Sequence, residues 1–148
     1  MIDLIIPATD TPGARGARVN EFIDVILTEW ANDSERQAFS NGLADVDRQS
    51  NVLFAKSFTG ASVEQQTALL REIDDVAMSH RTAQRARHGN TIPADRDKQL
   101  QGNFWDVFKG ITLHGYYTSE IAFTQEEKLQ IIPGAYHGCV PSTVEKKA

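Results

Sequence analysis

The sequence contains little cysteine and no long apolar run. Cys139 is the only cysteine among 148 residues, and a single thiol cannot close a disulfide within the chain. In an exported protein an odd cysteine suggests pairing with another chain, whereas in a cytosolic protein it is most often a small buried side chain. No segment reaches the roughly 18 consecutive apolar residues of a membrane span. We therefore expect neither a disulfide-stapled fold nor direct membrane insertion.

The sequence also lacks an excess of positive charge. Its formal net charge is −5, and acidic and basic residues are mixed along the chain, so no broad basic field would attract nucleic acid. Hydrophobic residues make up 41% and charged residues 24%, which is ordinary for a soluble globular protein. These values predict one folded domain over residues 1–148 that does not bind nucleic acid.

A recognisable secretory leader is absent as well, because no charged segment followed by an apolar one precedes the fold. The first residues, MIDLIIP, are apolar at Ile2, Leu4, Ile5 and Ile6. They resemble the end of an apolar segment that began upstream, and we therefore expect that the sequence has been trimmed.

No segment keeps the period-two alternation of a β-strand, but four segments keep the helical period. The clearest covers residues 18–30, where an apolar stripe lies opposite an acidic face. Further helices are predicted after residue 34 to about 54, from 62 to about 80, and from about 100 to 113. The expected core-facing residues are Val19, Phe22, Ile23, Ile26, Leu27, Trp30, Phe39, Leu43, Val46, Leu53, Phe54, Leu69, Leu70, Ile73, Val76, Ala77, Phe104, Trp105, Phe108, Ile111 and Leu113. The predicted fold is all-α: a single domain of about four main helices with an irregular C-terminal tail.

Capping residues and glycines mark the helix ends and crossings. The segments Ser34–Gln37 and Ser62–Gln65 both have the spacing of a capping box. Gly115 follows the last predicted helix, where a C-terminal cap is expected. Gly42 lies inside the second helix and costs about 1 kcal/mol relative to alanine, so it indicates a close helix crossing.

Two polar segments are predicted to be surface loops. The loop from Pro7 to Gly13 is rich in turn-forming residues, and Thr9, Asp10 and Thr11 favour a turn over a cation site. Residues 80–99 are polar and basic. They are more simply a solvated loop, beginning as an extension of the preceding helix, than an anion site.

The sequence offers few candidates for catalysis. No nucleophile comes with both a base and an orienting group, and no glycine-rich phosphate loop follows a strand. His114, Glu120, His137 and Cys139 come nearest to a metal-binding set, but the His-x-Cys spacing lacks the paired pattern of structural zinc sites. An independent metal- or ligand-binding protein built on these four residues is the alternative that stays open.

Residues 115–141 concentrate the remaining chemistry. They follow the last predicted helix and contain all three tyrosines, Tyr116, Tyr117 and Tyr136, together with Cys139. Tyrosine recurs in interfaces because its ring and hydroxyl give contact area at a low entropic cost. This segment is predicted to be a partner-binding tail, with the equal alternative that its rings anchor it to the chain's own helices.

Four motifs carry a resemblance to a known family. They are IIPATDTPGA at residues 5–14, VNEFID at 19–24, LHGYYTSEI at 113–121 and PGAYHGCVP at 133–141. On these motifs the chain resembles the gluconate 2-dehydrogenase subunit 3 family, the small subunits of membrane-associated, FAD-dependent sugar or polyol dehydrogenases. The resemblance implies an accessory subunit with no chemistry of its own.

The resemblance also implies partners, cofactors and a compartment. The catalytic partner would be a large GMC-type flavin subunit that holds FAD, often beside a multihaem cytochrome c, with haem c or an iron–sulfur cluster elsewhere in the complex. Family members bind and stabilise the flavin subunit and accompany it across the membrane on a twin-arginine (Tat) leader, which implies a periplasmic, membrane-associated complex. This sequence lacks that leader, so either the leader was removed or this member acts without export.

A partner-binding role selects residues for contact. We expect the tail and the loop from Pro7 to Gly13 to make the contacts, through Thr9, Asp10, Tyr116, Tyr117, Glu120, Tyr136, His137 and Cys139. If the complex matures in an oxidising compartment, Cys139 is predicted to form a disulfide with the large subunit. No residue of this chain is expected to be catalytic or to bind a cofactor or a metal.

Overall fold

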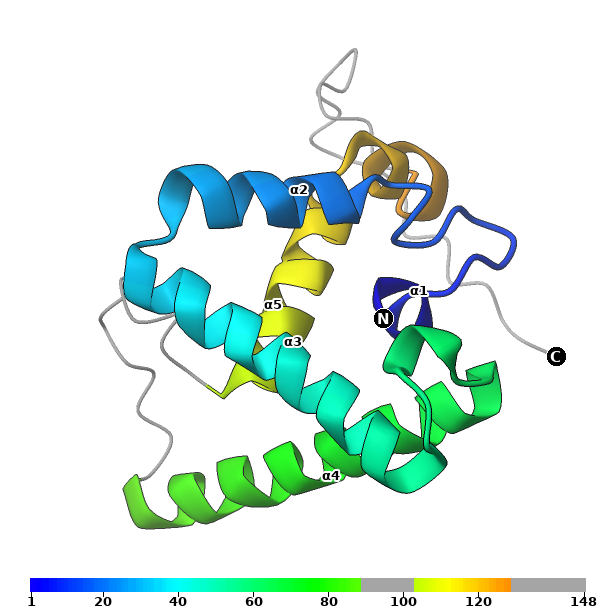
Figure 1. The fold of residues 1–148 in the computed structure, drawn as a ribbon. Helices are drawn as coiled ribbons and strands as arrows, with labels where there is room; N and C mark the ends of the chain where they lie inside the picture. Colours follow the sequence, from blue (N-terminus) through cyan, green and yellow to red (C-terminus); the bar gives the residue numbers. More distant parts are fainter. Residues whose placement is uncertain (89–102, 129–148) are drawn as a thin grey trace, which may run out of the picture.

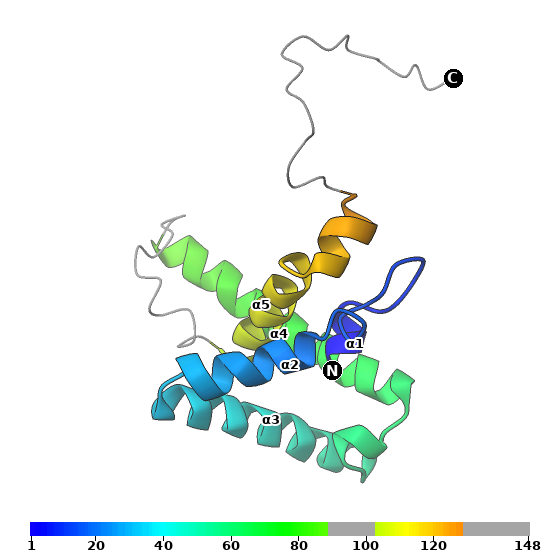
Figure 2. The same ribbon diagram turned by 90° about the horizontal axis from the view of Figure 1, so that it is seen from above.

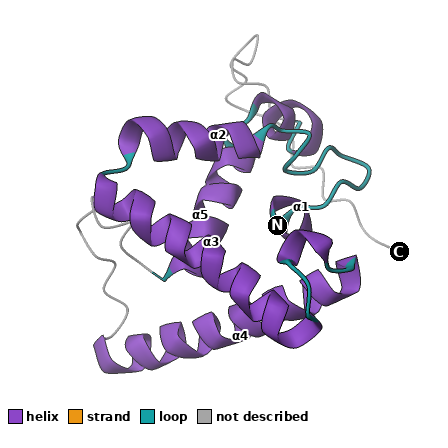
Figure 3. Ribbon diagram, in the orientation of Figure 1, coloured by secondary structure: helices purple, strands orange, loops and turns teal. Residues whose placement is uncertain are grey.

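The computed structural model describes residues 1–88 and 103–128, and every regular element within them is a helix (Figures 1 and 3). The elements are α1 (Ile2–Ile5), α2 (Val19–Val25), the π-helical turn η1 (Ile26–Trp30), α3 (Asp33–Phe54), the 3-10 turn η2 (Phe58–Gly60), α4 (Val63–His88), α5 (Phe104–Tyr117) and the π-helical turn η4 (Ala122–Glu126). The prediction of an all-α fold with four main helices is confirmed. No helix of this described part is long and apolar enough to cross a membrane.

Helix α5 is the element around which the others pack. Helices α1, α2, α3 and α4 all contact it, and Figures 1 and 2 show it surrounded by α2, α3 and α4. The reason lies in its sequence, FWDVFKGITLHGYY, which has more aromatic residues than any other helix. Its buried residues are Trp105, Val107, Phe108, Thr112, Gly115 and Tyr116.

A close crossing of α3 and α5 forms the aromatic part of the core. The rings of Phe39 and Phe104 meet edge to face with centroids 5.3 Å apart, and Trp105 stacks on Phe108 at 6.1 Å. Gly42 makes the crossing possible, because a Cβ atom at this position would overlap the ring of Phe104. The close helix crossing predicted from Gly42 is therefore confirmed.

One predicted cap is correct and two are not. The backbone N–H groups of Ser62 and Gln65 each donate to the other's side chain, at 3.0 and 3.3 Å, as a capping box requires. For α3 the capping box is instead Asn32 with Glu35, two residues earlier than Ser34–Gln37, because the amide oxygen of Asn32 accepts from the Glu35 N–H. The third cap, Gly115, is not at a helix end at all.

Gly115 lies inside α5, which continues to Tyr117. A Cβ atom on Gly115 would lie 2.6 Å from Cδ1 of Phe22, so the glycine serves close packing of α2 on α5 rather than termination. The tail therefore begins later than residue 115. Within the predicted tail, residues 115–117 complete α5 and residues 122–126 form η4.

Five apolar residues that were predicted to face the core are exposed: Trp30, Leu43, Leu53, Val76 and Leu113. Trp30 is 75% exposed, because η1 is a π-helical turn in which the Ala31 N–H donates to the carbonyl of Ile26, five residues back. A π turn contains one residue more than an α turn, so it shifts the following side chains off the α-helical stripe. Leu43 and Val76 lie at the edges of their stripes.

The apolar residues at the start of the chain pack on its own core. Met1, Ile2, Leu4, Ile5 and Ile6 are partly buried against the core cluster, and α1 contacts α5. The sequence alone suggested the end of an upstream apolar segment, whereas in the structure these residues have partners within the domain.

Candidate partner interface

The loop from Pro7 to Gly13 is an ordered turn at one end of the molecule. The Ala14 N–H donates to the carbonyl of Ile6 at 3.0 Å, and the Thr9 N–H to that of Thr11 at 3.0 Å. The Thr9 hydroxyl donates to the Asp10 carboxylate at 2.9 Å. These bonds confirm the turn, and they leave the side chains of Thr9 and Asp10 exposed.

Tyr116 connects this loop to the other end of the chain. Its side chain is 1% exposed, and its hydroxyl lies 3.0 Å from the carbonyl oxygen of Pro12, which is 104 residues away in the sequence. The same hydroxyl donates to a carboxylate oxygen of Glu126 in η4. One phenol group thus joins the N-terminal loop, α5 and η4, and the loop and η4 lie side by side in both ribbon views (Figures 1 and 2).

The surroundings of Tyr116 keep its hydroxyl neutral. Burial raises the pKa of the Tyr116 phenol, and the hydrogen bond to Glu126 raises it further, while the Thr11 hydroxyl acts in the opposite direction. The neutral hydroxyl has a single proton to donate, and the Pro12 carbonyl and the Glu126 carboxylate are the two acceptors beside it.

The residues after Tyr116 turn the chain toward η4. The Ser119 hydroxyl donates to the Tyr116 carbonyl at 2.6 Å and accepts from the Ala122 N–H at 3.2 Å. The ring of Tyr117 meets that of Tyr116 edge to face, at 5.3 Å, but Tyr117 itself is exposed. Glu120 is exposed as well.

Five of the eight predicted contact residues fall within the described residues. Thr9, Asp10, Tyr117 and Glu120 are exposed at the end of the molecule where the loop meets α5. Tyr116 is at the same end, but its side chain is internal and anchors the chain to itself. Tyr136, His137 and Cys139 lie outside the described residues.

Two members of the metal-binding alternative, His114 and Glu120, fall within the described residues. His114 is exposed, and its ring lies 5.9 Å from that of Phe22. Across residues 1–88 and 103–128, no three His, Cys, Asp or Glu side chains come together in a way that could hold a metal ion. His137 and Cys139, the other two members of the proposed set, are outside these ranges.

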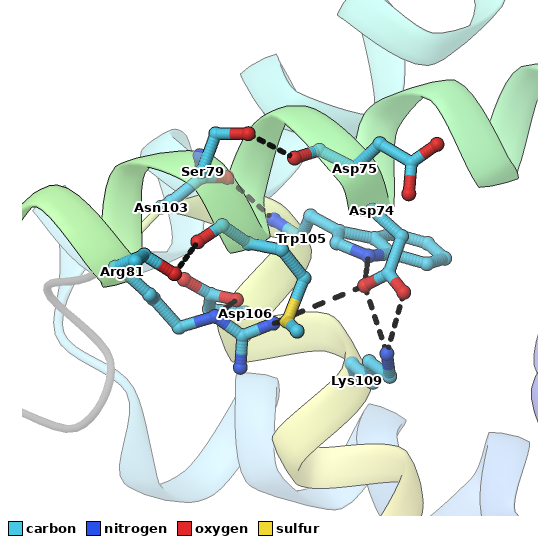
Figure 4. A network of polar contacts seen from close by, with 10 residues as sticks. Asp74, Asp75, Ser79, Arg81, Asn103, Trp105, Asp106 and Lys109 are labelled. Atoms are coloured by element: carbon cyan, nitrogen blue, oxygen red, sulfur yellow. Dashed lines mark hydrogen bonds and ion pairs between the residues drawn. The ribbon is translucent and has the colours of Figure 1, made fainter.

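A polar network between α4 and α5 was not predicted from the sequence (Figure 4). The Asp74 carboxylate accepts from the indole N–H of Trp105 at 2.8 Å and from the ammonium of Lys109 at 2.8 and 3.0 Å. The hydrogen bond from Lys109 is the largest cause that holds the pKa of Asp74 below its usual value, and the bond from Trp105 is the next. The network fixes α5 against α4 and orients Trp105.

Arg81 extends the same network. Its Nε atom lies 3.4 Å from a carboxylate oxygen of Asp106, and its Nη2 lies 3.9 Å from Asp74. Sequence analysis placed this arginine at the start of a solvated basic loop. The predicted extension of the preceding helix is confirmed, because α4 continues to His88, but Arg81 is paired within the fold rather than solvated.

A groove of about 250 Å³ lies between α3 and α4 beside the start of α5. Its apolar part is built from Val46, Ile73, Val76 and the rings of Phe104 and Trp105, and its polar part includes Asp45, Glu72 and Gln49. Asp45 is already paired with Arg48 at 2.7 Å. The groove lies at the opposite end of α5 from the Tyr116 hydroxyl.

Comparison with known proteins gives one match. The sequence model of the family described as Gluconate 2-dehydrogenase subunit 3 matches residues 1–134. The chain belongs to this family. Its name describes one subunit of a dehydrogenase, so this member of the subunit 3 family is a dehydrogenase subunit and has partner subunits. Neither the curated proteins nor the solved structures that were searched contain a match.

The extent of the match bears on the candidate interface. The matched range includes the loop from Pro7 to Gly13 and all of the described residues of the C-terminal part, and it ends before Tyr136, His137 and Cys139. The resemblance predicted from the four motifs is thereby confirmed for the subunit 3 family. Of the predicted interface, the end formed by the loop, α5 and η4 lies both within the matched range and within the described residues.

Proposed function

We propose that this chain is the accessory subunit that binds the flavin-containing catalytic subunit of a sugar dehydrogenase. In this role it stabilises the catalytic subunit, which would be a large GMC-type protein holding FAD, and helps it to mature. The observation that carries the proposal is membership of the subunit 3 family over residues 1–134. The substrate class, a sugar, sugar acid or glycoside, would be set by the partner.

The proposed binding surface is the end of the molecule where the N-terminal loop meets α5 and η4. Exposed hydrogen-bonding groups and an exposed ring occur there together, in Thr9, Asp10, Tyr117 and Glu120. Tyrosine at the centre of an interface buries a large area with few rotatable bonds. In this proposal Tyr136, His137 and Cys139 also contact the partner, and Cys139 forms a disulfide with the large subunit.

The charge of this surface suggests what the partner offers in return. In the segments 7–13 and 117–128 the charged residues are Asp10, Glu120, Glu126, Glu127 and Lys128. Four of these five are acidic, so a partner surface with lysine, arginine or free backbone N–H groups would be complementary. Such a contact would form faster at low ionic strength than at high ionic strength.

Location and export follow from the same proposal. A subunit that accompanies a folded flavoprotein through the Tat pathway would reside in the periplasm, in a complex held at the membrane by another subunit, such as a multihaem cytochrome c. A folded helical body of this kind is compatible with transport in the folded state.

Co-expression tests the proposed function directly. The flavin dehydrogenase encoded beside this chain would be produced with it, and the complex purified through a tag on this chain. We expect a yellow, active complex, whereas the catalytic subunit produced alone should be less soluble or lose flavin. Recovery of this chain by itself, colourless and monodisperse, would contradict the proposal.

A further inference from the structure

We infer that Tyr116 is the positioning residue of the partner interface: its hydroxyl holds the loop from Pro7 to Gly13 and η4 together as one binding face. This inference rests on the proposed function and deepens it, because it assigns the assembly of the surface to a residue that does not itself touch the partner.

The geometry sets Tyr116 apart from the other hydroxyl groups of the domain. Its ring is buried at the end of α5, yet its hydroxyl reaches out of that helix to two other segments, at Pro12 and Glu126. The hydroxyls of Thr112 and Thr118, also on or next to α5, donate to carbonyls four residues back, at 2.8 and 2.7 Å. Of these three hydroxyl groups, that of Tyr116 is the one that links α5 to both other segments.

Each segment is also tied to the domain at one buried alanine, Ala14 after the loop and Ala122 at the start of η4, both 0% exposed, and the Gly13 carbonyl accepts from the Ala17 N–H at 3.0 Å. The loop's own hydrogen bonds connect it to α1, through Ala14 and Ile6, and within itself, through Thr9 and Thr11. Beyond Ser119, η4 is a single π-helical turn of five residues, and a helix this short is not stable on its own. These ties lie at the ends of the two segments nearest the core, and the Tyr116 hydroxyl adds one contact farther along each segment, at Pro12 and at Glu126.

The consequence for binding is that the face is assembled from residues about a hundred positions apart. Thr9 and Asp10 come from one segment, and Glu120 from the chain leading into the other. A partner that contacts both segments at once would lose affinity if either one moved, because part of its binding free energy would then be used to order that segment.

The decisive variant is Tyr116→Phe, which keeps the buried ring and removes only the hydroxyl. Thr112→Val is its matched control, because it also removes one buried hydroxyl from α5 but breaks a bond within the helix. Helical content and melting temperature would be measured for both full-length variants. Hydrogen exchange of the full-length chain would then report on residues 7–13 and 120–126, and binding to the flavin subunit would be measured at equilibrium.

We expect Tyr116→Phe to raise exchange in both segments and to weaken binding of the flavin subunit about tenfold, the effect of losing roughly one net hydrogen bond. Thr112→Val should leave exchange in both segments and the affinity near wild type. Glu126→Gln keeps an oxygen acceptor for the phenol and should weaken binding less than Tyr116→Phe does.

Three results would overturn the inference. Unchanged exchange in Tyr116→Phe would mean that the hydroxyl does not hold the segments. Raised exchange with unchanged affinity would mean that their position does not matter to the partner. Equal loss of affinity in Thr112→Val would reduce the effect to general stability. If the wild-type chain itself fails to bind the flavin subunit, the proposed function fails. If the wild-type chain binds and Tyr116→Phe binds equally well, only the inference about Tyr116 fails.

Discussion

The two ends of α5 are held in different ways. At its start, aromatic rings from α3 and α5 interlock around Gly42, and the charged network of Asp74, Trp105 and Lys109 fixes α4. At its end, one phenol hydroxyl reaches a loop and a short turn. The first end is fixed by packing that tolerates no added atom, whereas the second depends on a few directional bonds and presents exposed polar groups. We infer that the first end maintains the fold and that the second is suited to contacting a partner.

The largest effect is expected from Gly42→Ala at the packed end. The new methyl group would overlap the Phe104 ring, so α3 and α5 must separate, and we expect a loss of about 1–3 kcal/mol in the free energy of unfolding. Chemical denaturation measures this loss. Gly110→Ala is the control, because a Cβ there meets nothing within 4 Å, and it should stabilise by up to about 1 kcal/mol. Equal destabilisation by both variants would contradict the packing argument.

A second effect at the same end is expected from Asp74→Asn, which keeps an acceptor for Trp105 but removes the charge that faces Lys109. The side chains of Asp74 and Lys109 are about one-third exposed, at 33% and 32%, so solvent weakens the pair and we expect a loss of about 1–2 kcal/mol at neutral pH.

The loss should depend on pH in a defined direction. Because the folded pKa of Asp74 lies below its usual 3.8, its contribution is present above about pH 4 and disappears as the pH falls through the lower folded value. Wild type and variant should therefore converge in acid. A difference that does not shrink as the pH is lowered below about 4 would show that the charge is not the cause.

A smaller pH effect is expected at the other end. Since the folded pKa of Tyr116 is raised above its usual 10.0, the stabilisation due to its neutral form is complete below about pH 10 and is lost as the pH rises through the folded value. Tyr116→Phe should lack this component of alkaline unfolding. Melting temperatures of the two proteins between pH 8 and 11, compared by difference, would test it.

The smallest effect on stability is expected from Tyr117→Ala. Tyr117 is exposed, so its truncation should change the free energy of unfolding by no more than about 0.5 kcal/mol. On the proposed function, the same variant should weaken binding of the flavin subunit by at least tenfold, as truncation of a central interface tyrosine does. A variant that loses stability and keeps full affinity would place Tyr117 in the fold instead.

Much of the fold was predictable because its signals are local. The apolar stripe that begins at Val19 and the Ser62–Gln65 capping box depend only on neighbours within a few residues, and the structure contains both, the stripe as far as Leu27. Gly42 was informative because a glycine inside a strongly helical segment has few explanations other than close packing.

The rest depends on partners distant in the sequence. Gly115 is compatible with a helix cap and with a tight contact, and only the position of Phe22 on α2 decides between them. Trp30 followed the apolar stripe, but a single π turn shifts its side chain. Asp74 is bonded to residues 31 and 35 positions away. One sequence signal could have predicted these bonds. Asp74 lies four residues after Leu70 and between Ile73 and Ala77, on an apolar helix face, where a carboxylate needs a basic or N–H partner.

The candidate interface was predictable only as two separate segments. The motif residues in the loop and after Leu113 were selected independently, and no sequence pattern indicates that Pro12 and Tyr116 meet. Tyr116 was predicted to contact the partner but is buried, whereas Tyr117 beside it is exposed. The difference depends on which side of α5 each ring occupies.

The contrast between the two tryptophans offers a practical means of observation. The indole of Trp105 is 3% exposed and hydrogen-bonded to Asp74, whereas that of Trp30 is 75% exposed on the π turn. With no other tryptophan in the sequence, replacing either one by phenylalanine leaves a single intrinsic fluorophore. Emission from Trp105 would then follow unfolding of the core, and quenching or a blue shift of Trp30 would reveal whether the subunits of an assembled complex cover that side of the domain, without any added label.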